Sequence, residues 1–155
     1  MSHDRSREIH LVEQPRIPLD GLILGWGAMI PFAVIAAAVW LGPPDWRDGL
    51  RLAAQIWGVA LMLFLSGVRR GLSFRTPGGP GRAQMAAFAL LFWGGFGTMF
   101  LPVDWGLAVI AVAFALLSVE DTRAARAGEA PLYFARLRPG QMAFAAVAVA
   151  AVWFG

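Results

Sequence analysis

The sequence contains no cysteine and no lysine, and its only two histidines, His3 and His10, lie in the first ten residues. The lack of cysteine excludes disulfides, iron–sulfur clusters, thiolate catalysis and cysteine-type zinc sites. The two histidines are too far from the hydrophobic part of the chain to ligate haem, copper or a chlorophyll magnesium there. We therefore expect no metal site and no cofactor.

Charge is also scarce, because only 15% of the 155 residues are charged whereas 58% are hydrophobic. A soluble domain usually has about 25% charged residues. The hydrophobic residues are gathered in blocks, which is typical of a membrane protein. All thirteen basic residues are arginine and the net charge is +3. Loop arginines that set membrane orientation explain this surplus, so we expect no binding to nucleic acid.

Five hydrophobic blocks approach the roughly 20 residues that a helix needs to cross a bilayer. Lipid offers no hydrogen bonds to the backbone, so these blocks should be helices. We predict an all-α integral membrane protein with a polar cytoplasmic tail over residues 1–20 and a five-helix transmembrane domain over residues 21–155. The first block lacks a small-residue cleavage site and should be retained. The helices are expected at about 21–41, 50–68, 83–101, 104–119 and 137–154.

The arginines predict the orientation of the bundle. Eleven of the thirteen fall in the tail or in the loops after the second and fourth helices, and only Arg47 and Arg51 fall on the other side. The positive-inside rule then places the N-terminus in the cytoplasm and the C-terminus in the periplasm. We expect a multi-pass protein of a bacterial inner membrane, in contact with membrane lipids.

Charged pairs mark the cytoplasmic ends of two predicted helices. Arg69 and Arg70 end the second helix, and Glu120 and Asp121 end the fourth. The pairs could join across the bundle, the arginines could bind anionic lipid headgroups, or each pair could be a solvated helix end. No charged residue lies in the middle of a block, where proton-coupled transporters and intramembrane enzymes keep one. We expect no catalytic residue and no enzyme.

Small, aromatic and acidic residues suggest further sites. Gly67 and Gly71 are four residues apart, a spacing that lets another helix approach closely. Pro31 should kink the first helix. A cavity beside that kink would suit a lipid or quinone, and three aspartates on the outer face could hold a hard cation. The residues of these two alternatives are Trp26, Phe32, Trp57 and Trp93 for the cavity, and Asp45, Asp48 and Asp104 for the cation.

Three stretches resemble one family. IPLDGLILGWGAMIPF, which ends at Phe32, resembles the family's Pro, Leu-Gly, Gly and Pro-Phe opening. WGVALMLFLSGVRRGLSF resembles its aliphatic run ending in Phe-Leu-(Gly/Ser)-Gly-Val followed by Gly, and EDTRAARAGEAPLYFARLRPGQM resembles its acidic residue, Pro, aromatic residue and Leu-Arg before the last helix. This is domain-of-unknown-function family 3429, small bacterial membrane proteins related to the mitochondrial inner-membrane protein called transmembrane protein 69. The resemblance implies five helices and an inner membrane, but no activity.

These observations favour a non-enzymatic accessory, assembly or stabilising subunit of a larger membrane complex, with respiratory or photosynthetic machinery as one setting. An integral membrane protein is the expected partner. The competing hypothesis is a small carrier or binder of a lipid or quinone. The residues expected to make structural or interfacial contacts are Gly67, Arg69, Arg70, Gly71, Glu120, Asp121, Tyr133, Leu137 and Arg138.

Overall fold

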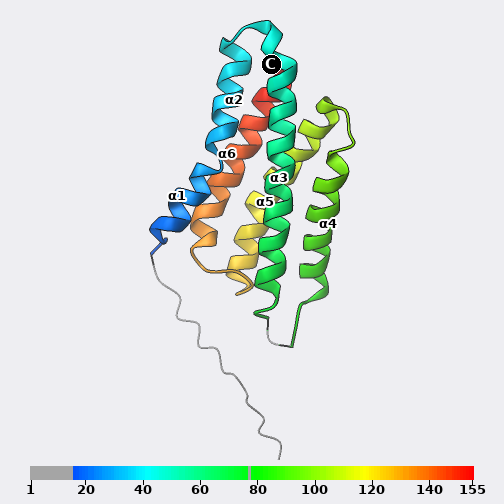
Figure 1. Ribbon diagram of the computed structural model, residues 1–155. Helices are drawn as coiled ribbons and strands as arrows, with labels where there is room; N and C mark the ends of the chain where they lie inside the picture. The colour runs from blue at the N-terminus through cyan, green and yellow to red at the C-terminus, as the bar shows by residue number, and fades with distance from the viewer. Residues whose placement is uncertain (1–15, 77) are drawn as a thin grey trace, which may run out of the picture.

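The computed structural model describes residues 16–76 and 78–155, and within these ranges every regular element is a helix (Figure 1). The all-α prediction is therefore confirmed. The elements in chain order are α1 (Leu19–Gly27), α2 (Ile30–Leu41), the 3-10 helix η1 (Pro44–Trp46), α3 (Arg47–Ser73), α4 (Arg82–Thr98), α5 (Val103–Arg126) and α6 (Phe134–Phe154).

Four stretches are long and apolar enough to cross a membrane. They are Leu19–Leu41, which combines α1 and α2, then Pro44–Ser73, Val103–Arg126 and Phe134–Phe154. α4 has 17 residues. At 1.5 Å per residue it extends for about 25 Å, which is slightly less than a hydrocarbon core of roughly 30 Å. The chain is a multi-pass membrane protein.

Two helices continue beyond the hydrophobic blocks that predicted them. α3 runs on to Ser73 rather than ending near residue 68, and α5 runs on to Arg126 rather than ending near residue 119. Hydropathy falls where charged residues begin, but arginine and alanine are good helix formers and the backbone stays helical. The charged residues at these ends therefore lie on helices, with fixed directions for their side chains.

The first membrane segment is broken between α1 and α2. Pro31 lies in the first turn of α2 and has no N–H to donate, and its ring would clash with the carbonyl of Gly27 in a continuous helix. α1 accordingly ends at Gly27 and α2 begins at Ile30. The interruption predicted at Pro31 appears as a two-residue turn, Ala28 and Met29, between the two helices.

The bundle is centred on α3, α5 and α6. α5 packs extensively along α6, and α3 contacts α2, α4, α5 and α6. Figure 1 shows α1 and α2 on one side of the bundle and α4 on the opposite side. In the core, the rings of Phe32 on α2 and Phe114 on α5 meet edge to face with centroids 5.7 Å apart, and both are fully buried.

Polar side chains cap the helix ends beside η1. Gln55 Nε2 donates to the carbonyls of Thr98 (2.8 Å) and Leu101 (3.1 Å), where α4 has ended. Trp40 Nε1 donates to Ala151 O at 2.9 Å, and Arg51 Nη2 donates to Trp153 O at 3.2 Å. The last carbonyls of a helix have no partner within the helix, so these side chains supply donors at the helix ends, although Thr98 O also accepts from Leu101 N–H.

Candidate functional site

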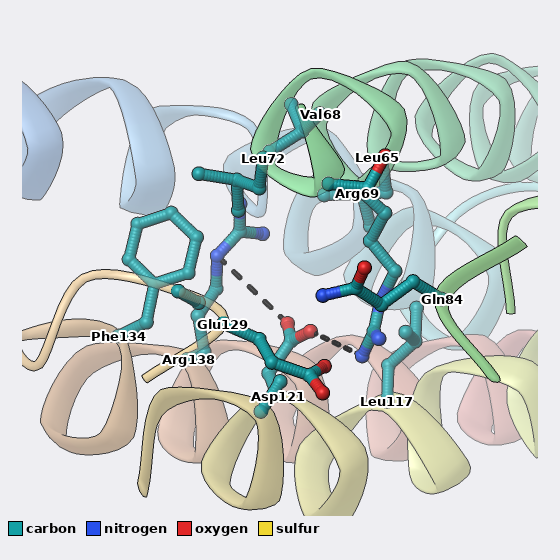
Figure 2. A pocket seen from close by; sticks show the side chains of 13 residues that line it. Leu65, Val68, Arg69, Leu72, Gln84, Leu117, Asp121, Glu129, Phe134 and Arg138 are labelled. Carbon is teal, nitrogen blue, oxygen red and sulfur yellow. Dashed lines mark hydrogen bonds and ion pairs between the residues drawn. The ribbon is translucent and has the colours of Figure 1, made fainter. Parts of the chain in front are cut away.

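A small cavity lies at the opposite end of the bundle, where the last turns of α3 and α5 meet the first turns of α6 (Figure 2). Its volume is about 30 Å³. That is room for about two or three water-sized groups, and a lipid or quinone ring would not fit. Four charged residues line it, namely Arg69, Asp121, Glu129 and Arg138.

Asp121 is the centre of this cluster and has an arginine on each side. Arg69 Nη2 donates to Asp121 Oδ1 at 2.7 Å, and Arg138 Nε lies 3.9 Å from Asp121 Oδ2. The side chains of Arg69, Asp121 and Arg138 are only 16%, 11% and 14% exposed. Two guanidinium groups and one carboxylate leave one net positive charge in a partly buried position.

Helix periodicity explains why these side chains turn inward. Asp121 lies four residues after buried Leu117 and four before buried Ala125, so it occupies the core-facing row of α5. Arg69 follows buried Leu65 by four residues on α3. On α6, the Arg138 guanidinium lies over the ring of Phe134, one turn earlier, with its carbon 4.8 Å from the ring centroid.

The guanidinium donors are not fully used. Arg69 Nε is buried and has no hydrogen-bond partner within the described part of the chain. Arg138 donates no hydrogen bond to any described residue, since its approach to Asp121 at 3.9 Å is too long for one. The Arg138 guanidinium therefore still has N–H donors available for a bound group.

Two of the predicted charged residues lie outside the cluster. Arg70 Nη1 donates to Ser73 Oγ at 3.1 Å, and its guanidinium carbon is 4.1 Å from the Phe74 ring centroid. Glu120 accepts from Arg123 Nη1 at 2.6 Å on the same helix, in an exposed pair. Of the two charged pairs considered in the sequence, only Arg69 and Asp121 meet across the bundle.

The predicted glycine pair faces outward. Gly67 and Gly71 are both exposed on α3, and a Cβ atom added at either would meet nothing within 4 Å. They do not mediate packing within the described chain. The close glycine contacts are elsewhere, with a Cβ at Gly58 lying 2.7 Å from Ile110.

The last two predicted contact residues lie at the start of α6. The Tyr133 ring packs edge to face on Phe134 with centroids 5.0 Å apart. It also faces Gly21 of α1, where an added Cβ would lie 3.7 Å from the ring. Leu137 is buried, at 7% exposure. Both residues therefore hold the first turn of α6 in place next to Arg138.

The predicted aromatic cavity is not formed by the rings proposed for it. Trp26 lies on α1 and contacts Phe144, with centroids 5.8 Å apart, whereas Trp93 lies on α4 on the opposite side of the bundle and is 65% exposed (Figure 1). Trp93 packs only along its own helix, against Phe92 and Phe96. These two rings cannot line one cavity.

The other members of that group serve the core and the helix break. Phe32 packs in the core against Phe114. Trp57 on α3 donates its indole N–H to Ala28 O at 3.0 Å. In a continuous helix that carbonyl would accept from Phe32 N–H, which instead donates to Met29 O. Trp57 thus stabilises the break that Pro31 causes.

The aspartate cation site, considered only as an alternative to the expected lack of a metal site, is not assembled either. Asp104 forms an ion pair with Arg51 across α3 and α5. Within residues 16–76 and 78–155, no three acidic or histidine side chains lie close enough together to hold a metal ion. Asp45 is part of η1, and Asp48 lies in the first turn of α3.

Sequence reasoning missed one buried polar residue. Gln141 on α6 is 1% exposed, and its Nε2 has no hydrogen-bond partner among the described residues. The amide lies against Gly25 of α1, where any added Cβ would overlap it. A glutamine that follows Pro139 and Gly140 within an otherwise apolar run was the available signal.

The comparisons with known proteins identify a family but no function. Searches of the curated proteins and of the solved structures find no match to the chain. Residues 17–154 match the family described as "Protein of unknown function (DUF3429)". The matched range includes all six α-helices. The match covers nearly the whole chain, so this protein belongs to the DUF3429 family.

Proposed function

We propose that this protein is a non-enzymatic accessory, assembly or stabilising subunit of a larger complex in a bacterial inner membrane. Its partner would be another integral membrane protein, and respiratory or photosynthetic machinery is one setting. The suggested relation of the family to transmembrane protein 69 of mitochondria fits an inner membrane of this kind. Binding would occur through a helix face rather than through a soluble domain.

The observation that carries this proposal is the outward-facing Gly67–Gly71 pair on α3. Each glycine in a helix interior costs about 1 kcal/mol relative to alanine in water. A Cβ atom added at either residue would meet nothing within 4 Å among the described residues. In lipid, where helices associate by close packing, an exposed glycine pair lets a second helix approach. Phe64 and Phe74 flank the pair and are 63% and 66% exposed, so an approaching helix would find large rings on either side of a flat surface.

The polar side chains of the bundle support a structural role. Gln55, Trp57 and Arg51 use their donors to satisfy carbonyls at helix ends and at the α1–α2 break. Such bonds hold the bundle in shape. A bundle held in this shape, with an exposed glycine pair on α3, suits a protein that acts by contact.

The proposal includes five membrane crossings with a cytoplasmic N-terminus. α3 and α4 lie side by side, and the α3–α4 and α5–α6 connections, together with the arginine-rich helix ends next to them, lie at the same end of the bundle as the start of α1 (Figure 1). The C-terminus lies at the other end, near η1. If α4 crosses with its neighbours despite its 17 residues, every arginine-rich segment falls on the cytoplasmic side.

The test is gentle extraction of the tagged protein from its own membranes, followed by mass spectrometry of stoichiometric partners. A membrane protein should co-purify with the wild type. Gly67→Leu and Gly71→Leu should each lose it, because a leucine fills the space that the second helix needs. Both variants should keep the stability of the isolated bundle, since the added side chains point away from it.

Gly97→Leu is the matched control. Gly97 is exposed on α4, and an added Cβ would also meet nothing within 4 Å. This variant should retain the partner. The proposal fails if the wild type is recovered alone, or if the partner stays bound to both α3 variants.

A further inference from the structure

The geometry points to a binding site for a single phosphate group in the cavity between Arg69 and Arg138. The ligand class is a phosphate mono- or diester, such as the headgroup of an anionic lipid, or free phosphate. This inference does not depend on partner binding at the Gly67–Gly71 face, because neither glycine lines the cavity, and it shares with the proposed function only the cytoplasmic placement of this end of the bundle.

The first argument is the supply of unused donors. Asp121 accepts a hydrogen bond from Arg69 but not from Arg138, which lies 3.9 Å away. Arg138 is 14% exposed and has no hydrogen-bond partner among the described residues. A guanidinium that has left water needs acceptors, and phosphate oxygens suit its fork of N–H groups.

The second argument is size and position. A cavity of about 30 Å³ accommodates a few oxygen atoms but no large ring. Figure 2 shows Arg138 and Arg69 on either side of Asp121, with the amide of Gln84 facing the space between them. Apolar side chains, including Leu72 and Phe134, form the rest of the lining and would contact the carbon atoms next to a headgroup.

The third argument is the surrounding charge. This end of the bundle also carries Arg75 in the α3–α4 connection, Arg82 at the start of α4, and Arg123 and Arg126 in the last turn of α5. On the cytoplasmic side such a surface attracts anionic lipid. One group opposes it, because the carboxylate of Glu129 lines the cavity mouth. Glu129 is exposed, so water screens its charge, but it should still weaken the binding of an anion.

Because the cavity has charges of both signs, removal of an arginine and removal of a glutamate should change the phosphate affinity in opposite directions. The purified full chain, in a neutral detergent, is titrated with short-chain phosphatidic acid, phosphatidylglycerol, phosphatidylcholine and inorganic phosphate. Binding is followed by native mass spectrometry and by the rise in the thermal unfolding midpoint. Arg138→Gln should weaken binding about tenfold, the loss of roughly one charge-assisted hydrogen bond. Glu129→Gln should strengthen it about threefold by removing a screened repulsion.

Arg136→Gln is the matched control, because Arg136 is exposed on the same helix and does not line the cavity. Its affinity should stay within about twofold of the wild type. Tighter binding of phosphatidic acid or phosphatidylglycerol than of inorganic phosphate assigns the site to a lipid headgroup. Equal binding of inorganic phosphate assigns it to a free phosphate.

Three results would overturn the inference: no binding of any phosphate compound, an equal loss in Arg136→Gln and Arg138→Gln, or no gain in Glu129→Gln. If Arg138→Gln does not fold, the Glu129→Gln result decides the matter alone. That side chain is exposed and in the α5–α6 connection, so its replacement leaves the packing of the bundle unchanged.

Discussion

At the scale of single residues, Asp121 has the greatest consequence for the charged cluster. Among the described residues it is the carboxylate that pairs with both Arg69 and Arg138, and all three side chains are less than one-fifth exposed. In such a place an ion pair adds little net stability over an apolar substitute, but removal of one partner leaves an uncompensated charge.

Asp121→Asn should therefore destabilise the bundle strongly. The change keeps the shape of the side chain and removes the only negative charge between two guanidinium groups. We expect a loss of about 3 kcal/mol in the free energy of unfolding, measured by chemical denaturation in mild detergent.

Glu120→Gln tests the same chemical change one residue earlier. Glu120 is half exposed and pairs with Arg123 on the surface of α5. Exposed pairs contribute little, so this variant should remain within about 1 kcal/mol of the wild type. Equal effects of the two variants would show that the depth of Asp121 does not matter, contrary to this interpretation.

The sequence indicated that charges of opposite sign end two helices. It did not indicate which residue of each charged pair faces the core. Successive helix residues are rotated by about 100°, so Glu120 and Asp121 cannot share a face. The row Leu117, Asp121 and Ala125 contains the answer, because apolar residues lie four positions on either side of the aspartate. The second cation, Arg138, comes from a helix whose packing angle no local pattern gives. Arg138 was expected to make a contact, but its position beside Asp121 could not be predicted.

At the scale of elements, hydropathy located the helices and misplaced several of their ends. It measures which residues enter lipid, whereas a helix ends where its backbone hydrogen bonds end. α3 and α5 continue into their charged segments for this reason. The break at Pro31 was predictable because the missing N–H is a property of the residue itself. The sequence did not predict that the carbonyl of Ala28 would be freed or that the Trp57 indole would donate to it.

Trp57→Phe isolates that hydrogen bond. Phenylalanine keeps an aromatic ring on α3 but cannot donate to Ala28 O, which Trp57 Nε1 reaches at 3.0 Å. A partly buried carbonyl without a donor costs about 1–3 kcal/mol, so the free energy of unfolding should fall by that amount. Trp93→Phe should be nearly neutral in the same measurement because its ring is 65% exposed on α4. A neutral result for Trp57→Phe would mean that another donor replaces the indole.

At the scale of the whole molecule, the aromatic cavity failed as a prediction because depth in the membrane does not specify direction. Trp26 and Trp93 lie within hydrophobic segments, but α1 and α4 are on opposite sides of the bundle (Figure 1). Rotation about each helix axis, set by packing on α3, α5 and α6, decides where each ring points. Composition and charge placement, by contrast, were enough to predict a helical multi-pass protein.

The number of crossings depends on α4, and the lack of cysteine makes it measurable. Single cysteines at Asp45, Arg75, Ala127 and Phe154 can each be labelled in intact cells with a membrane-impermeant maleimide. All four residues are exposed, in η1, after α3, after α5 and at the end of α6. With five crossings, the variants at Asp45 and Phe154 should be labelled from outside, and those at Arg75 and Ala127 only after lysis.

If α4 did not cross, the two later sites would exchange sides while the two earlier ones stayed as they are. Labelling of Ala127→Cys from outside, with Phe154→Cys protected, would therefore contradict the five-crossing arrangement. Without a crossing by α4, the end of α5 that carries Asp121 would lie on the membrane face opposite to Arg69. In the structure, however, Asp121 lies 2.7 Å from Arg69 at the end of α3. One ion pair cannot join opposite membrane surfaces about 30 Å apart. The Arg69–Asp121 contact therefore favours the proposed arrangement, in which α4 brings the chain back across the membrane.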